Sequence, residues 1–413
     1  MNQKKSRLSQ AMVFLILFGI VSLFSDMTHE GASSIRGAYL ALLGASAGAI
    51  GFISGLGELI GYSMRYLFGR VTDRTRSYWP MVILGYVLDI IAVPALALVG
   101  EHGWIAACLL LVVQRMGKAI KKPAKDTIMS FAASQEGAGR SFGLQELLDQ
   151  IGAFLGPVLL WLVMLGRTDA SPIRTYSLCF AVLAIPGGIT LLLLLYTRSR
   201  FPNPEQFEPE PKEYIPFRMK KSFILYIAGI SLFAFGFIDY SLIVMHISRT
   251  AALSGAAGLI TEETLPLLYA GAMLIDAVSA LFFGFLYDRI GVRSLIFSTL
   301  LSSGFAVFIF SMHSVPALLV GIALWGIGMG AQESILKAAV SSMVPKSSRA
   351  TGYGIFECSF GFFWFLGSWL MGALYDFSIP AMVAVSVAAQ LLSIPLYLAS
   401  SRQKIREEQP LHE

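Results

Sequence analysis

Long apolar stretches, separated by short polar breaks, follow one another along almost the whole chain. Each stretch holds enough residues to cross the hydrocarbon core of a bilayer as a helix, which takes about 20 residues. Dividing the pattern at charged and turn-forming residues predicts helices at 11–30, 38–68, 79–99, 103–121, 141–165, 175–196, 222–246, 265–287, 294–312, 316–340, 350–373 and 379–399. The sequence therefore predicts an all-α membrane protein with about 12 transmembrane helices.

One polar interruption is much longer than the others and divides the predicted helices into two sets of six. It covers 197–221 and is rich in proline and glutamate, a composition typical of an extended linker. We therefore predict an N-terminal six-helix bundle in residues 1–196, a cytoplasmic linker in 197–221, and a C-terminal six-helix bundle with a cytoplasmic tail in 222–413.

The two predicted bundles repeat each other at equivalent positions. Two short patterns occur in both halves, namely Gly69-x-x-x-Asp73-Arg74 with Gly284-x-x-x-Asp288-Arg289, and Arg140-x-x-Gly143 with Arg349-x-x-Gly352. Each match is weak alone, but equivalent places in two six-helix units indicate a duplicated, pseudo-symmetric architecture.

Composition narrows the class of protein. Charged residues make up 14% of the chain and hydrophobic residues 55%, whereas a soluble domain carries roughly 25% charged residues. The three cysteines stand in separate apolar runs without metal-binding or redox spacing, and no phosphate-binding Walker loop occurs. We expect no metal, no cofactor and no enzymatic activity.

Lysine and arginine are distributed unevenly between the two sides of the predicted helices. Outside the helices, most of them fall on the side of the N-terminus, and four are expected on the other side: Arg36, Arg167, Arg174 and Arg249. By the positive-inside rule, this asymmetry predicts a multi-pass protein of the bacterial inner membrane with both termini in the cytoplasm. The net charge of +5 then needs no nucleic-acid partner.

Charged residues also occur inside the predicted helices, where each costs roughly 2.5–3.5 kcal/mol and normally faces a cavity or a partner. Helices six, nine and twelve have none in their interiors and helix three has Asp89, so every third helix is expected to face lipid. The residues that we assign to the substrate path and to coupling are Asp26, Glu30, Arg115, Lys118, Glu146, Asp149, Asp239, Glu333 and Lys337.

Spacing suggests how these charges act. Glu146 and Asp149 are three residues apart, so both carboxylates share one face of a helix, an arrangement that favours a reversible proton site. Alternatively, each pairs with a basic neighbour such as Arg115 or Lys118. Asp26, which precedes Glu30 by one turn, is the rival proton carrier. Glu333 and Lys337 are four residues apart and can pair with each other as a structural unit.

The doubled loop pattern resembles the signature of the major facilitator superfamily, which follows the second helix and recurs in degenerate form after the eighth. The resemblance covers nearly the whole chain and implies two six-helix bundles that transport a small solute by alternating access. It also implies that helices one, four, seven and ten line the path. The residues to which it assigns a gating role are Gly69, Asp73, Arg74, Gly284, Asp288 and Arg289.

A second resemblance concerns the fifth helix and the direction of transport. Gly143, Gly152, Gly156 and Pro157 keep the spacing found in drug/proton antiporters of the superfamily, although Leu160 and Trp161 replace its final glycines. The match implies a proton-coupled exporter that functions as a monomer; the same residues are also compatible with a plain packing face and a bend. The alternative function is proton-coupled import of a polar metabolite or a metal chelate.

Overall fold

The structure is a computed structural model that describes residues 9–136, 138–166, 171–203, 206, 219–254, 260–311, 314–344 and 349–408. All regular elements in these ranges are helices. The first half contains α1 (Gln10–Leu42), α2 (Ala47–Thr75), α3 (Tyr78–Ala95), η1 (Leu96–Leu98), α4 (Trp104–Glu136), α5 (Ala138–Leu165), α6 (Pro172–Val182) and α7 (Ala184–Arg200).

The second half contains α8 (Lys221–Gly236), α9 (Tyr240–Ser254), η3 (Glu262–Thr264), α10 (Leu265–Ile290), η4 (Gly291–Arg293), α11 (Ser294–Ser302), α12 (Phe305–Phe310), α13 (Val315–Met343), α14 (Arg349–Phe377) and α15 (Ile379–Glu408). Three crossings are each built from two consecutive helices: α6 with α7, α8 with α9, and α11 with α12.

Within the described ranges, 9 stretches are long and apolar enough to cross a membrane. One of them, Glu262–Phe310, is 49 residues long and holds two crossings. Helices α2 and α4, with 29 and 33 residues, are also long enough but carry more charges. Counted this way, the described residues hold twelve candidate crossings, and the predicted all-α membrane fold is confirmed.

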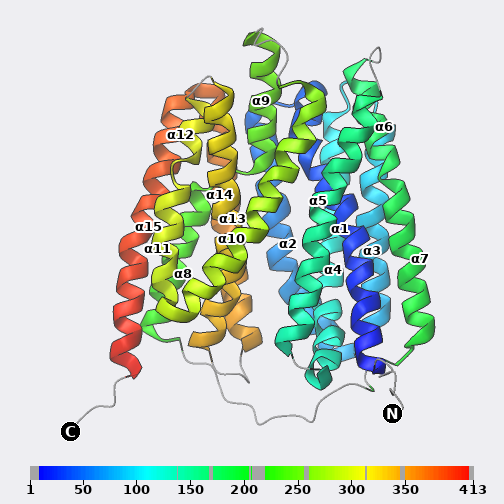
Figure 1. Cartoon of the computed structure of the whole chain (residues 1–413), viewed down its shortest axis with the longest axis vertical. Helices are drawn as coiled ribbons and strands as arrows, with labels where there is room; N and C mark the ends of the chain where they lie inside the picture. Colours follow the sequence, from blue (N-terminus) through cyan, green and yellow to red (C-terminus); the bar gives the residue numbers. More distant parts are fainter. Residues whose placement is uncertain are drawn as a thin grey trace, which may run out of the picture.

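The helices form two groups that stand side by side, with α1 to α7 in one and α8 to α15 in the other (Figure 1). The first residue of α1 and the last residue of α15 lie on the side that is drawn lowest in Figure 1, which we call the lower face; the opposite side is the upper face. The most extensive contacts between the groups join α2 with α14, α1 with α9, and α5 with α10. Helices α3 and α7 lie at one edge and α11, α12 and α15 at the other, as the distribution of charges predicted.

The two helix ends that differ most from the sequence-based expectation do so for one physical reason. The first helix continues past Arg36 to Leu42 and turns at Gly44, whose φ of +97° suits glycine. The fourth helix continues past Lys121 to Glu136. In both places the cationic side chain is buried and paired inside the bundle, so it does not mark a loop. Arg174 and Arg249, also expected in loops, lie in α6 and α9.

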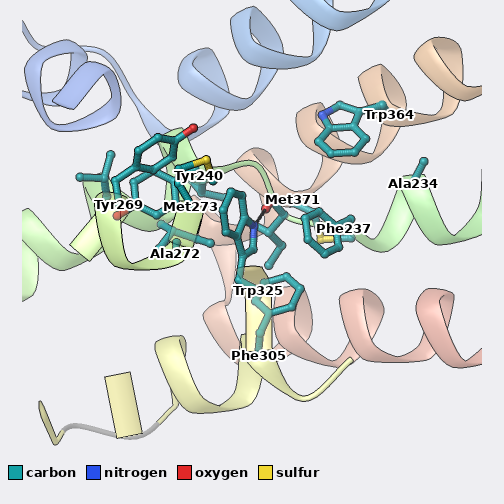
Figure 2. Packing of buried hydrophobic residues seen from close by; sticks show 14 of the residues in the cluster. Ala234, Phe237, Tyr240, Tyr269, Ala272, Met273, Phe305, Trp325, Trp364 and Met371 are labelled. Atoms are coloured by element: carbon teal, nitrogen blue, oxygen red, sulfur yellow. Dashed lines mark hydrogen bonds between the residues drawn. The ribbon is translucent and has the colours of Figure 1, made fainter. Parts of the chain in front are cut away.

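The core of the second half is aromatic and shapes the break between α8 and α9. Phe237, Tyr240, Tyr269 and Trp325 pack against one another (Figure 2), with ring centroids of Tyr240 and Tyr269 4.5 Å apart. The indole nitrogen of Trp325 donates to the backbone oxygen of Ile238 at 3.0 Å, which satisfies a carbonyl of the non-helical link. This packing fixes the following residue, Asp239, where it faces the first half.

Candidate functional site

Asp26 of α1 lies at the centre of a group of charges between α1, α4 and α5. Its side chain is half-buried. Its main electrostatic neighbours are Asp149 of α5 and the ammonium groups of Lys118 and Lys125 on α4. The charges of one further carboxylate and two ammonium groups therefore act on Asp26 within the first half.

Glycines bring α1 and α5 close enough for this meeting. A Cβ atom on Gly152 would lie 2.2 Å from the backbone oxygen of Leu23, and one on Gly156 would lie 2.3 Å from that of Met27. These two positions of the predicted helix-five pattern thus form a packing face against α1. Pro157 lies within the same helix, and the surroundings of Gly143 fall outside the description.

The proposed partners of Glu146 and Asp149 differ from those that the sequence suggested. Asp149 is half-buried, and its basic neighbours are Lys125 and Lys122 where Arg115 or Lys118 had been expected. Glu146 is exposed and accepts a hydrogen bond from Gln150 at 3.4 Å. Gln150 also contacts the buried Asp276 of α10 at 3.4 Å, so Glu146 lies on the side of α5 that meets the second half.

Most cations on α4 have partners. The guanidinium of Arg115 pairs with the Glu58 carboxylate at 2.7 Å, and both side chains are largely buried. Lys121 pairs with Asp89 of α3 and donates to Ser25 at 3.2 Å. Asp89 is therefore a structural anion, which explains the charge in an outer helix.

Lys118 is the exception. Its side chain is half-buried, one turn from Arg115, and makes no hydrogen bond or ion pair with the described residues. Its electrostatic neighbours include Glu30 and Asp26. Because an unpaired ammonium group inside a membrane segment is costly, this position has spare capacity to bind an anionic group.

Glu30 links the two halves through a tyrosine that the sequence gave no reason to select. The Tyr269 hydroxyl donates to the Glu30 carboxylate at 2.5 Å, and His29 lies 3.6 Å from the same carboxylate. His29 also contacts Gln114 of α4. Tyr269 and Gln114 are uncharged, so the distribution of charged residues along the sequence could not reveal that they belong to this network.

The halves are locked together near the upper face by Arg36. Its guanidinium donates to the Ser241 hydroxyl at 2.8 and 3.1 Å and lies 3.8 Å from the Asp239 carboxylate. Next to it, a Cβ atom on Gly37 would lie 1.8 Å from the backbone oxygen of Ser241. Helices α1 and α9 therefore touch backbone to backbone.

A second upper contact joins α2 to α14. A Cβ atom on Gly51 would lie 2.2 Å from the Ser368 backbone oxygen, and one on Gly372 would lie 2.4 Å from that of Ala47. The Asp376 carboxylate also accepts from the Gly48 amide at 2.9 Å, which caps the first turn of α2 from the other half. In this conformation the two halves are closed together at the upper face.

Ionisable side chains become exposed toward the lower face. The side chains of Lys122 and Asp126, an i,i+4 pair at 3.6 Å, are 40% and 47% exposed, and Glu146 and Glu333 are exposed as well. The side chain of Lys337 falls outside the description. Ionisable groups are thus buried between the halves near the upper face and exposed near the lower face.

The repeated loop patterns hold equivalent places in the two halves. A Cβ atom on Gly69 would lie 3.6 Å from Pro123 of α4, and one on Gly284 would lie 2.8 Å from the Ser334 hydroxyl of α13. Each glycine thus faces the fourth crossing of its own half. Arg74, Asp288 and Arg289 are exposed at the lower face, whereas the side chain of Asp73 falls outside the description.

Comparison with known proteins agrees with this architecture. The family model described as Major Facilitator Superfamily matches residues 8–261 and 250–413. An uncharacterized protein of Mycobacterium tuberculosis is 36% identical over 392 residues, which cover 94% of this chain and 92% of that protein. An uncharacterized MFS-type transporter of Methanocaldococcus jannaschii is 28% identical over 379 residues, or 88% of each chain.

Among solved structures, the nucleoside transporter NupG superposes with a TM-score of 0.71 at 15% identity, over 95% of this chain and 99% of that one. At that identity the likeness concerns the fold alone. Two helical groups with charges buried between them define a multi-pass membrane transporter rather than an enzyme. The chain belongs to the major facilitator superfamily.

Proposed function

We propose that the chain is a proton-coupled exporter of a small solute with an anionic group, working by alternating access. The observation that supports this cargo class is Lys118, the half-buried cation of α4 with no hydrogen bond or ion pair to the described residues. Arg115, one turn away, is already paired with Glu58, so among the described cations of α4 we assign Lys118 to the cargo. Glu30 and Asp26 neutralise it between transport events.

Proton coupling is assigned to Asp26 and Asp149. They are half-buried on facing helices, and the two like charges are neighbours among lysines. An anionic cargo at Lys118 removes a positive charge from this group, which favours protonation of a carboxylate. Taken alone, this sign makes cargo and proton bind together, which is the coupling of the import alternative. Export by exchange requires instead that the carboxylates are deprotonated when the cargo is bound and protonated when it is released, so the vesicle measurement below decides the direction.

Alternating access is assigned to movement of residues 1–196 against residues 222–413, joined by the linker at 197–221. Arg36, Asp239 and Ser241 separate when the upper face opens. In the opposite state the lower face closes, and the loop patterns take part there: Gly69, Asp73 and Arg74 with Gly284, Asp288 and Arg289. Every group in this scheme comes from one chain, so we propose a functional monomer.

Export is favoured by the spacing of Gly152, Gly156 and Pro157, which resembles that of drug/proton antiporters. The second candidate is proton-coupled import of a polar metabolite or a metal chelate. The observation that favours it is the mixture of charges along the path, with Arg115 beside Glu58 and Arg36 beside Asp239, because fixed charges of both signs suit a hydrophilic cargo.

The cargo class is tested by a thermal-shift screen of purified protein against small anionic, cationic and neutral solutes. We expect anionic solutes to stabilise the protein, and Lys118→Gln to weaken their binding about 10- to 100-fold, since hydrogen bonds to a charged group contribute roughly 1.5–3 kcal/mol. Lys221→Gln, which changes an exposed lysine at the start of α8, is the control.

A solute that stabilises the protein is then tested in everted vesicles. If the protein is an exporter, acidification of the vesicle lumen should drive accumulation of the solute in the lumen. If it is an importer, the same gradient should deplete the solute from the lumen. The assignment of Lys118 would be refuted if the solutes that stabilise the protein were neutral or cationic. It would also be refuted if the two lysine variants weakened solute binding equally. Depletion from acidified everted vesicles would favour the import alternative.

Orientation is a separate proposal, with the lower face in the cytoplasm of the bacterial inner membrane. It rests on the uneven distribution of lysine and arginine. Reporter fusions after Pro209 and at the C-terminus should both report a cytoplasmic location, and a fusion near Glu101 should report the outside. A reporter at Pro209 that faces outward would contradict both the orientation and the two-bundle scheme.

A further inference from the structure

An apolar hollow of about 520 Å³ lies between α10 and α11, at the edge of the second half. Its walls are the side chains of Phe282, Phe283, Leu286, Phe297, Leu300 and Leu301. Phe282 and Phe297 are 60% and 57% exposed, so the hollow opens on the surface that faces the hydrocarbon of the bilayer. Its volume lies within the range of roughly 300–1,000 Å³ typical of sites for small ligands.

A second hollow, of about 300 Å³, lies at the lower end of α10, between η4 and the end of α15. It contains three cations, Arg289, Arg293 and Lys404, and no acidic side chain is among its lining residues. Arg293 donates to Ser401 at 3.2 Å and Lys404 to Ser342 at 3.2 Å. These hydrogen bonds hold both side chains at the cleft.

The two hollows follow one another along the same face of α10. Phe282 and Leu286 line the apolar hollow, and Arg289, with Arg293 just beyond the helix, lines the basic one. Phe282, Leu286 and Arg289 are spaced by four and three residues, which places them in one stripe of α10. An apolar surface thus leads directly into a cluster of cations at the level where the helix ends.

We propose that the two hollows form one binding site for an anionic phospholipid of the lower leaflet. The phosphate binds Arg289, Arg293 and Lys404, and an acyl chain lies in the apolar hollow. A lipid fits because the apolar part faces the bilayer and the basic part lies at the helix end, where headgroups lie. Basic pockets at the helix ends of membrane proteins favour anionic headgroups. The proposal is independent of cargo and of the proton pathway.

The test is native mass spectrometry of the full chain in detergent, titrated with dioleoyl phosphatidylglycerol or dioleoyl phosphatidylcholine. We expect retention of phosphatidylglycerol and much weaker retention of phosphatidylcholine. Arg289→Gln and Lys404→Gln should each weaken retention of phosphatidylglycerol about fivefold. Arg402→Gln, which removes an exposed arginine of α15 that does not line the cleft, should leave it unchanged.

The part of the site that binds the acyl chain is tested with a separate pair of variants. Leu300→Gln should weaken retention of the dioleoyl lipid, whereas Leu192→Gln, which alters an exposed leucine of α7 (70% exposed), should not. Excess inorganic phosphate is added to the wild type as a competitor. Equal retention of both lipids, equal effects of Arg289→Gln and Arg402→Gln, or full displacement by inorganic phosphate would each overturn the proposal, the last by indicating a site for free phosphate.

Discussion

Asp26→Asn is expected to abolish transport driven by a proton gradient while leaving exchange of labelled for unlabelled cargo in place. The asparagine side chain cannot release and rebind a proton as the site changes face, whereas cargo exchange needs no net proton movement. Asp149→Asn should have the same effect, because the two carboxylates are electrostatic neighbours between α1 and α5. The measurement is cargo flux in proteoliposomes, with and without an imposed pH gradient.

Glu146→Gln is the matched control for this pair. Glu146 belongs to the same helix as Asp149, but it is exposed and accepts from Gln150, so gradient-driven flux should stay close to that of the wild type. If Glu146→Gln lost gradient-driven flux while Asp26→Asn kept it, the proton site would have to be assigned to the lower part of α5. Normal flux in all three variants would exclude coupling through these carboxylates.

Gly37→Val should shift the protein toward a state that is open at the upper face. A Cβ atom at this position would lie 1.8 Å from the Ser241 backbone oxygen, so α1 and α9 must separate before the side chain fits. Overpacking of this kind costs about 1–3 kcal/mol. A change of that size moves a two-state equilibrium about 5- to 150-fold. Transport should fall in proportion, because the closed upper face becomes rare.

The shift can be measured by electron paramagnetic resonance with spin labels at Leu98 and Phe377, in a variant without the three native cysteines. Both side chains are highly exposed near the upper face, at 88% and 86%, and they belong to different halves. Gly37→Val should lengthen the distance between the labels. Gly188→Val, where no atom lies within 4 Å of the new Cβ, should not. Equal distances in the wild type and Gly37→Val would show that the α1–α9 contact does not control the upper face.

The sequence predicted the number of crossings and the outer helices well because both depend on one quantity, the cost of placing a charge in hydrocarbon. It misplaced the ends of the first and fourth helices because Arg36 and Lys121 are charged yet buried. Their anionic partners, Asp239 and Asp89, lie in other helices, and a hydropathy pattern does not show which distant residues meet.

The candidate site was predictable in its charges but not in its pairing. Glu58 and Arg115 stand in different helices with no spacing rule between them, and the contact between Tyr269 and Glu30 spans the two halves. The glycines of α5 were recognised as a pattern. Their effect, which is to pack the helix of Asp149 against the helix of Asp26, depends on where α1 lies. Pairing across helices is therefore the part that required the structure.

The ion pair between Lys121 and Asp89 has a consequence for how the chain enters the bilayer during synthesis. Helix α4 carries Lys118, Lys121 and Lys125, and each lysine costs roughly 2.5–3.5 kcal/mol when a helix inserts alone. Helix α3, which precedes α4 after a short link, carries Asp89 and packs closely along it. The two segments can leave the translocation channel as a hairpin in which one charge of each sign is already neutralised. Lys125, which donates to Ser22 at 2.5 Å, finds its partner on α1, a helix that has been synthesised earlier. The order of helices along the chain thus supplies each of these two lysines with a partner by the time it reaches the membrane.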